Sequence, residues 1–403
     1  MPVVPLDATP IALVHGTLLP VDGPPIPDGT LVLKGRSIAA LGPGVPVPAG
    51  ARVIDCTGHF VSPGIIDIHS HMGVYPWPDG TAHGDGNEAV EPFTPRVWAG
   101  DAFDAEDPAI PRARAGGVTT IQVLPGSANL VGGRSAILKL RDSILLDALL
   151  FREAPPGIKM AIGENPKRVY SGAEHDHDQI QTRMGEYAAF RAKFQEALDY
   201  RVARQRKDPP PRDLDLDVLL DVLDGKVRVH LHCYRTHDIQ AFLRVAEQFG
   251  FKVASLQHAL EAYKIRALVA AHGAGVATFA DWWGFKLEAW DAIPQNAVLC
   301  AEAGIVTCIH SDSASHIQRL PLEAAKMMRY GWTEAQALES VTLAPARLLG
   351  ADQRVGTLTV GKDADVAVWS HHPTDVYTRC LRTFVDGVQV YDRDKEGTPN
   401  GIR

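Results

Sequence analysis

The 403-residue sequence predicts a mixed α/β protein: a (β/α)8 TIM barrel with a small β-sandwich domain formed by the two ends of the chain. Three observations lead to this prediction. In the middle of the chain, eight apolar, β-branched runs alternate with helical patterns, as expected for parallel strands covered on both faces. Both ends contain short alternating runs interrupted by Gly and Pro, which are typical of strands and turns. Polar residues follow several of the apolar runs, where barrels of this kind build their sites.

Residues 1–62 and 351–403 are predicted to form the two parts of the β-sandwich. Each end has too few strands to enclose a core alone, so we expect the two ends to pair. The strands expected in these ends are Ile11–Val14, Thr30–Leu33, Ser37–Ala40, Arg52–Asp55, Asp365–Trp369, Arg382–Val385 and Val388–Tyr391.

Residues 63–350 are predicted to form the barrel. Two insertions interrupt it: residues 73–110, and residues 171–213 with a helix over Met184–Arg204. The expected barrel strands are Ile65–His69, Thr119–Leu124, Ala136–Leu140, Ile158–Ile162, Val227–His232, Lys252–Leu256, Gly275–Phe279 and Ile305–Ile309.

Composition limits the function classes. The net charge of −8 argues against a general nucleic-acid binder, and the chain contains no apolar run long enough to span a membrane. The N-terminus lacks the features of a signal peptide, and the five cysteines form no Cys-x-x-Cys pair. We therefore expect a cytoplasmic protein with buried, reduced thiols that acts on a small molecule. A homo-oligomer is compatible with these observations.

A histidine pair ends the first predicted barrel strand. In His69-Ser70-His71 the two imidazoles are two residues apart, so a strand presents both on one face. Two imidazoles on one face can form half of a zinc site. Taken alone, the pair is equally compatible with ordinary core or surface histidines.

Later strands add residues of the same kind. The fifth run ends in His230-Leu231-His232, the sixth is followed by His258, and the eighth by Asp312. Since all of these residues lie at the carboxyl ends of apolar runs, we expect them to converge at one mouth of the barrel. The sequence therefore predicts a metal site.

These motifs resemble those of the amidohydrolase superfamily of metal-dependent barrel hydrolases. The matching segments are GHFVSPGIIDIHSH at Gly58–His71, the strand-end residues His230, His258 and Asp312, and GTLTVGKDADVAVW at Gly356–Trp369. Within the superfamily the chain looks most similar to imidazolonepropionase and to the Xaa-amino-acid dipeptidases. The segment Pro125–Gly133 looks like the mark of a subgroup.

The resemblance implies one or two divalent metals, with zinc the first choice and manganese or iron as alternatives. It implies that His69, His71 and Asp312 hold the buried metal, and that His230 and His258 hold a second metal or complete the first site. Asp312 is implied as the general base that takes a proton from water during hydrolysis of an amide, cyclic amide or dipeptide bond.

Two residues compete for the bridging position. Lys159 matches the strand-four lysine that such enzymes carboxylate, whereas Glu164 resembles a strand-end glutamate that ligates directly. Because side chains alternate along a strand, both cannot point inward, and Lys159 is preferred. An uncarboxylated Lys159 in an ion pair is the structural alternative.

The positions of other polar residues relative to the predicted strands indicate further roles. His232 is expected to act in catalysis or substrate contact, or to replace His230 as a ligand, and His310 is expected to be a buried, hydrogen-bonded residue. Asn129, Tyr234 and Asp281 are expected to contact the substrate. His175 and His177 are expected in a solvated loop.

Two other functions remain open. A mononuclear deaminase of a heterocyclic amine would use a similar centre, but the segment after the fifth strand, His232–Thr236, lacks the glutamate such enzymes usually carry. A non-catalytic binding protein is the other alternative, and it would be expected to have lost ligands that this chain keeps.

Overall fold

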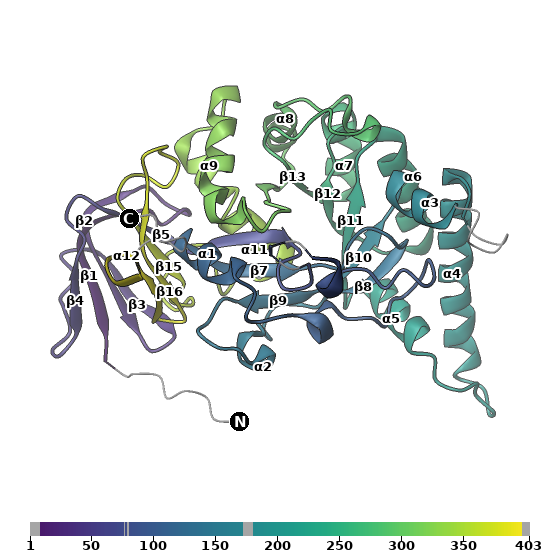
Figure 1. Cartoon of the computed structure of the whole chain (residues 1–403), viewed down its shortest axis with the longest axis horizontal. Helices are drawn as coiled ribbons and strands as arrows, with labels where there is room; N and C mark the ends of the chain where they lie inside the picture. The colour runs from purple at the N-terminus through teal and green to yellow at the C-terminus, as the bar shows by residue number, and fades with distance from the viewer. Residues whose placement is uncertain (1–8, 76, 79, 172–179, 397–403) are drawn as a thin grey trace.

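The computed structural model describes residues 9–75, 77–78, 80–171 and 180–396, and it has a mixed α/β fold. Strands from the two ends of the chain form one end of the molecule, and the other strands lie among the helices (Figure 1). The predicted His175 and His177 lie outside the described residues. Within the described part, no helix is long and apolar enough to cross a membrane.

The two ends of the chain pair in one eight-stranded sheet, as predicted. Its hydrogen-bonded path runs β17-β16-β15-β5-β1-β2-β3, and β4 pairs with β1. Strands β5 and β15, from opposite ends of the sequence, pair antiparallel and join the two halves of the sheet. The bounds are β1 Ile11–Leu18, β2 Ile26–Lys34, β3 Ser37–Pro43, β4 Arg52–Asp55, β5 Phe60–Pro63, β15 Val366–Trp369, β16 Cys380–Val385 and β17 Val388–Asp392.

The remaining strands form a six-stranded and a three-stranded sheet, in the orders β14-β13-β12-β11-β10-β8 and β6-β7-β9. These strands coincide with all eight predicted runs and add β8, which was not predicted. Their bounds are β6 Ile65–Ser70, β7 Val118–Val123, β8 Val131–Arg134, β9 Ala136–Lys139, β10 Gly157–Ala161, β11 Arg228–Cys233, β12 Val253–His258, β13 Gly275–Thr278 and β14 Thr307–Ile309.

The third predicted strand runs in the opposite direction to the prediction. β9 pairs antiparallel with β7, and β8, one residue upstream, pairs antiparallel with β10. The prediction of eight parallel strands is therefore wrong at this position. The physical reason is the short segment between β7 and β8, because a parallel crossover needs a dozen or more residues and usually a helix.

The two sheets contact each other at both edges. The Ser135 amide, between β8 and β9, donates to the Gly157 carbonyl at 2.9 Å. At the other edge, the Asp312 amide donates to the His69 carbonyl at 3.1 Å. These bonds bring the ends of β6 and β14 together, so residues far apart in sequence become neighbours.

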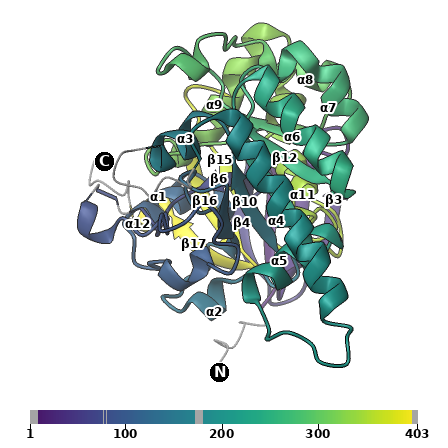
Figure 2. The same ribbon diagram turned by 90° about the vertical axis from the view of Figure 1, so that its right-hand side faces the viewer.

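The helices cover the outer faces of the strands. Figure 2 shows α4, α5 and α6 in front of the six-stranded sheet. The helices are α1 Ala109–Ala115, α2 Leu146–Leu149, α3 Glu164–Tyr170, α4 Arg183–Ala203, α5 Leu214–Leu223, α6 Thr236–Phe249, α7 Arg266–His272, α8 Asn296–Glu302, α9 Leu320–Ala325, α10 Glu334–Glu339, α11 Leu343–Leu349 and α12 Arg393–Glu396. Short 3-10 helices are η1 Thr81–His83, η2 Ala99–Ala102, η3 Ala262–Ile265, η4 Leu287–Ala289, η5 Ile317–Arg319 and η6 Lys326–Tyr330.

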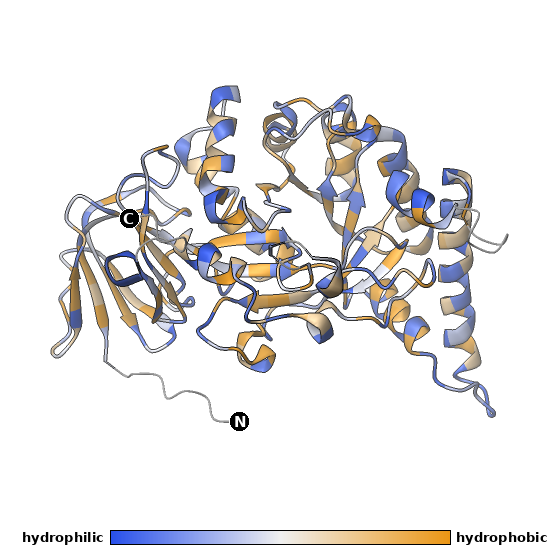
Figure 3. Ribbon diagram, in the orientation of Figure 1, coloured by the Kyte–Doolittle hydropathy of each residue, from blue (hydrophilic) through white to orange (hydrophobic). Residues whose placement is uncertain are grey.

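Helix α4 is the predicted helix of the second insertion. The Thr182 side chain caps it by accepting from the Gly185 amide, which satisfies one of the free amides at the helix start. Its residues Phe190 and Phe194 are fully buried in the core that also contains Met160 of β10. Figure 3 shows mostly hydrophobic residues (orange) along the strands, whereas hydrophobic and hydrophilic residues alternate along α4.

A buried ionic cluster joins β9 to the C-terminal part of the chain. The Lys139 ammonium contacts Asp363, and it lies 3.2 Å from Asp365 and 2.6 Å from Asp386. The Lys139 side chain is fully buried, and Arg141 also pairs with Asp386 at 2.7 Å. Asp363 and Asp365 therefore help to hold the C-terminal part of the chain against β9.

Candidate active site

The predicted residues His69, His71, His258 and Asp312 lie together where the carboxyl ends of β6, β12 and β14 meet. His258 and Asp312 have positive φ values of 67° and 46°. L-residues rarely adopt this region, and residues held there are concentrated at functional sites. The turn at each position lets the chain leave its strand.

The hydrogen bonds of His69 and His71 determine which ring nitrogens are free. His69 Nδ1 bonds the Gln257 side-chain oxygen at 2.9 Å, and His71 Nδ1 bonds the Leu124 carbonyl at 2.7 Å. Since oxygen accepts in both cases, each Nδ1 carries the proton and each neutral ring keeps a lone pair on Nε2. The two Nε2 atoms are 3.2 Å apart, and Asp312 Oδ1 lies 3.6 and 3.4 Å from them.

His258 and His310 extend this group of rings. The His310 ring stacks on that of His69 with centroids 4.9 Å apart, and it lies 5.0 Å from that of His258. His258 Nδ1 and both His310 nitrogens are buried without a hydrogen bond of ordinary geometry, although the Ala277 backbone influences the pKa of His310. His310 is buried as predicted, and its interaction with the Ala277 backbone raises its pKa against the effect of burial.

Ligand atoms of two groups lie close enough to share a cation. Ring nitrogens of His69, His258 and His310 are within 4.8 Å of one another, as are atoms of His69, His71 and Asp312. Converging lone pairs and orphaned buried nitrogens are costly unless a proton or a cation lies between them. The donor set of imidazoles and a carboxylate suits a divalent metal, zinc above all.

Burial keeps the histidines neutral. Desolvation lowers the pKa of His71 and His310 to about 3, with a further contribution from the Lys159 charge, and lowers the pKa values of His69 and His258 well below the usual value. The same desolvation raises the pKa of Asp312, and the Lys159 charge partly opposes that shift. Neutral imidazoles are the form that binds metal.

The structure distinguishes His230 from His232. The His232 ring lies 4.7 Å from that of His258, whereas His230 Nδ1 bonds the Ser255 hydroxyl at 2.7 Å and its Nε2 is buried without a partner. His232 is held by Ser127 and by Asn165, at 2.9 and 3.3 Å. His232 is thus the member of the pair that borders the other rings.

Lys159 and Glu164 occupy different surroundings. Lys159 is fully buried on β10, and its ammonium donates to the Pro125 carbonyl at 3.1 Å. Its charge depresses the pKa values of His69, His71 and His232, so it lies close to the cluster. Glu164 begins α3 and belongs to neither group of potential ligands found among the described residues.

Asn129, the first of the three expected substrate contacts, is bonded to other parts of the protein. The Asn129 amide is engaged within the protein, donating to the Glu88 carbonyl and the Thr94 hydroxyl at 2.8 Å and accepting from Tyr170 at 2.6 Å. These bonds hold the first insertion against the loop before β8.

Of the other two expected substrate contacts, only Tyr234 touches one of the clustered histidines. The Tyr234 ring stacks on that of His258 at 5.2 Å and is therefore part of the site wall. Asp281 is half-exposed and pairs with Lys326 at 2.9 Å. Trp282 stacks on Phe279 at 4.6 Å, whereas Trp290 is largely exposed.

A buried charged group that sequence reasoning missed links α4 and α6 to the loops after β10 and β13. Arg183 of α4 bonds Asp238 of α6 at 2.9 Å and Glu288 at 2.7 Å. Glu186, fully buried beside them, accepts from the Gly163 amide at 3.0 Å. The group joins the second insertion to the loops that follow β10 and β13.

Glu186→Gln is expected to raise stability at neutral and alkaline pH. Desolvation raises the pKa of Glu186 to about 7, above its usual 4.5, so the folded state binds its proton more tightly than the unfolded state does. Wild-type stability from this group is therefore lost as pH rises from about 4.5 to 7. Glutamine keeps an acceptor for the Gly163 amide and has no proton to lose. The free energy of unfolding of Glu186→Gln relative to wild type should therefore increase by about 1–3 kcal/mol over that pH range.

Melting temperatures of the two proteins between pH 5 and pH 8 test this expectation. Glu196→Gln is a matched control, because Glu196 is an exposed residue of the same helix that pairs with Lys193. A constant difference between Glu186→Gln and wild type across the range would contradict the expectation.

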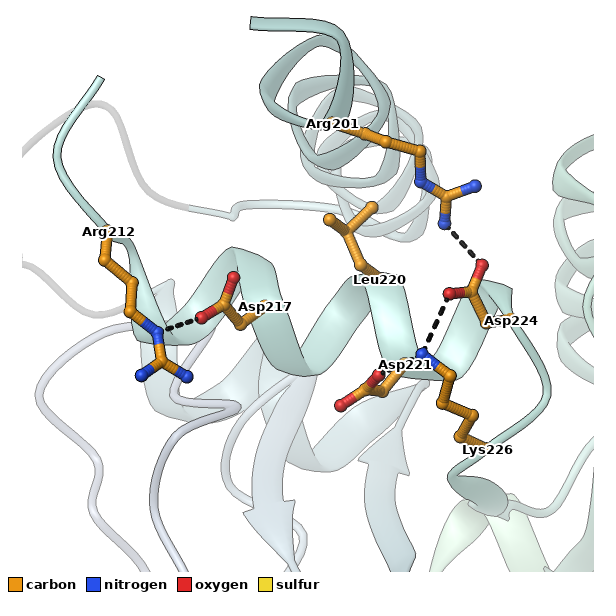
Figure 4. A pocket seen from close by; sticks show the side chains of 7 residues that line it. All are labelled: Arg201, Arg212, Asp217, Leu220, Asp221, Asp224 and Lys226. Carbon is orange, nitrogen blue, oxygen red and sulfur yellow. Dashed lines mark hydrogen bonds and ion pairs between the residues drawn. The ribbon is translucent and has the colours of Figure 1, made fainter. Parts of the chain in front are cut away.

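A surface hollow between α4 and α5 has no part in this site. Arg201 pairs with Asp224, and Arg212 pairs with Asp217, both at 2.6 Å (Figure 4). Lys226 lies 3.0 Å from Asp221. Since its charges are paired with one another, the hollow presents no chemistry comparable to the histidine cluster.

Comparisons with known proteins agree on one family. A family model described as the amidohydrolase family matches residues 294–391. The crystal structure of an amidohydrolase from Thermotoga maritima MSB8 is 35% identical, with a TM-score of 0.89, and the match covers 95% of this chain and 100% of that one.

Two relatives found by sequence support the same family. Amidohydrolase tasK of Hapsidospora irregularis is 33% identical over 381 residues, which are 87% of this chain. The chain spans only 38% of the length of that relative. An imidazolonepropionase of Sphingopyxis alaskensis is 23% identical over 394 residues, 85% of this chain and 87% of that protein.

Proposed function

Because the chain belongs to the amidohydrolase superfamily, whose hydrolases act on carbon–nitrogen bonds, we propose that it hydrolyses an amide, cyclic amide or dipeptide bond with the help of a bound metal. The observation that carries this proposal is the cluster of buried neutral histidines around Asp312, with lone pairs that face one another. Such an arrangement is expensive to bury and is explained by a cation.

The proposed architecture is a barrel in which the third strand is reversed. The hydrogen bonds at both edges of the two smaller sheets support closure into a ring, and the eight-stranded terminal sheet would form the β-sandwich. The proposed limits are residues 1–62 and 351–403 for the sandwich and 63–350 for the barrel.

The metal would be held by His69, His71 and Asp312, with His258 and His232 completing this centre or forming a second one. His232 is preferred to His230 because its ring borders that of His258. His310 is a further candidate, since its nitrogens lack ordinary hydrogen bonds. Zinc is the proposed metal, with manganese or iron as alternatives.

Lys159 is proposed as the bridging residue rather than Glu164. Its burial and its position among the histidines support this choice, because carboxylation would replace an ammonium crowded against imidazoles with an anion. Burial also lowers the pKa of Lys159, which favours the neutral amine that carboxylation requires.

Asp312 is proposed as the general base. A bound divalent cation would supply Lewis acidity, polarising the scissile carbonyl and lowering the pKa of water from 15.7 to about 7. The Asp312 carboxylate takes a proton from the attacking water and delivers it to the departing nitrogen. Its raised pKa places it closer to neutrality, where both transfers are efficient.

Metal removal tests the proposal. Protein purified without chelator should contain zinc, manganese or iron and should hydrolyse members of a panel of dipeptides, N-acyl amino acids and cyclic amides. Dialysis against a chelator should abolish turnover and lower the melting temperature, and zinc or manganese should restore both. Metal-free protein that remained fully active would contradict the proposal.

Adding heterocyclic amines to the panel distinguishes the alternative functions. Ammonia release from a heterocyclic amine, with no cleavage of the amides, would identify a deaminase instead. Bound metal without turnover on any class would favour a binding protein.

A further inference from the structure

The loop between β13 and α8 places a lysine beside the histidine cluster. Lys286 is mostly buried, and its ammonium lies 4.1 Å from the centre of the Tyr234 ring. Since Tyr234 also stacks on His258, one aromatic ring separates the ammonium from that histidine. None of the roles derived above uses Lys286.

Two polar partners hold the Lys286 ammonium, and they leave part of its hydrogen-bonding capacity free. Its ammonium donates to the Asn165 side-chain oxygen at 3.1 Å, and Asn165 in turn contacts His232. It lies 3.4 Å from Glu288, but the Glu288 carboxylate already accepts from Arg183 and from the Glu164 amide, at 2.7 and 2.6 Å. Both of those bonds are made to Glu288 Oε1, whereas Lys286 faces Oε2. An ammonium has three donors, and Asn165 and Glu288 occupy at most two of them, which leaves one for a ligand.

Two neighbours connect Lys286 to the site. Asn165, which accepts from its ammonium, contacts His232, and the Tyr234 ring beneath the ammonium stacks on that of His258. Lys159 lies on β10 within the proposed metal centre, whereas Lys286 lies on a loop at the carboxyl end of β13. Its position thus suits a substrate group that lies beside the scissile bond.

We propose that Lys286 binds a carboxylate of the substrate, so that the amide cleaved by this protein carries an acidic group. An ammonium half shielded from water forms a strong charge-assisted hydrogen bond with a carboxylate. Asn165 and the Tyr234 ring keep the ammonium in place. The inference rests on the proposed function and narrows its substrates to acidic amides such as N-acyl amino acids and dipeptides.

Binding measurements test this inference without turnover. Ligand-observed NMR on the full chain as purified would compare succinate with its neutral isostere succinamide. We expect wild type to bind succinate more tightly than succinamide, and Lys286→Met to weaken succinate binding about 10- to 100-fold. Lys286→Arg, which keeps the charge, should retain most of the binding.

Lys264→Met is the matched control. Lys264 also lies over a tyrosine ring, 5.7 Å from the centre of Tyr263, and pairs with Glu261 and Asp291, but it lies outside the cluster. Its substitution should leave succinate binding unchanged. Equal binding of succinate and succinamide by wild type, or equal binding of succinate by wild type and Lys286→Met, would overturn the inference.

Kinetics separate this inference from the proposed function. On a cleaved N-acyl amino acid, Lys286→Met should raise KM with little change on the corresponding neutral amide. An equal rise in KM on both substrates would reject the carboxylate contact while leaving the hydrolase proposal intact. Absence of hydrolysis by wild type would reject the hydrolase proposal, and the succinate comparison would still decide the carboxylate contact.

Discussion

Asp312→Asn is expected to lower kcat by about 10²- to 10⁴-fold, the range that a positioned general base contributes. Asparagine keeps an oxygen that can face His69 and His71, but it cannot accept the proton of the attacking water. The bound metal should therefore remain near the wild-type amount. Metal content by elemental analysis and turnover on any cleaved member of the amide panel provide the two measurements.

Asp291→Asn is a suitable control for this variant. Asp291 is an exposed carboxylate that pairs with Lys264 at 2.8 Å and contacts none of the histidines. Its substitution should leave kcat near the wild-type value. If Asp312→Asn kept near-normal turnover with its metal in place, Asp312 would be excluded as the base.

Lys139→Met is expected to destabilise the folded protein by about 3–5 kcal/mol, the usual cost of removing one partner from a buried ionic group. Methionine fills most of the space, but Asp363, Asp365 and Asp386 would be left buried without their common cation. Protonation can neutralise these carboxylates, so the loss should shrink as pH falls toward 5. Chemical denaturation of both proteins at pH 8 and pH 5 measures it.

Lys226→Met provides the comparison. Lys226 also lies among aspartates, 3.0 Å from Asp221 and 3.2 Å from Asp224, but it is exposed on the surface (Figure 4). Water screens such pairs, so this substitution should cost only about 0–1 kcal/mol. Equal losses in the two variants would show that burial of the Lys139 cluster does not determine its contribution.

Strand positions were predictable because apolar periodicity is a local property. Every predicted run in the middle of the chain became a strand, and both ends joined one sheet. Direction is not local, since Ala136–Leu140 has the same pattern whichever way it runs. The available indication was the segment between this run and Thr119–Leu124. It has 11 residues, three of them glycine, whereas a parallel crossover needs a dozen or more residues and usually a helix.

The site was only partly predictable for a similar reason. Strand parity placed His230 and His232 on one face, but it could not tell which ring would border His258. His310 shares the parity of Asp312, and that spacing was the available indication that it also faces the cluster. Its ring contacts with His69 and His258 depend on other strands and could not be read from this spacing.

The sequence context of a lysine indicates burial in one case and not in another. Lys139 interrupts an apolar strand, and a charge in such a run requires buried partners, which Asp363 and Asp365 supply. Lys286 gave no comparable indication, because a lysine in a loop rich in aromatic residues is most often exposed. Its approach to Tyr234 is a tertiary feature.

The pairing of β5 with β15 has a consequence for biosynthesis. Strands β1–β5 leave the ribosome about 300 residues before β15–β17, which at 5–20 residues per second is a delay of about 15–60 s. During that interval the nascent chain presents β5 as an unpaired edge, a hazard for intermolecular association. We therefore expect chaperones that shield nascent chains to raise the yield of this protein, and C-terminally truncated chains to aggregate.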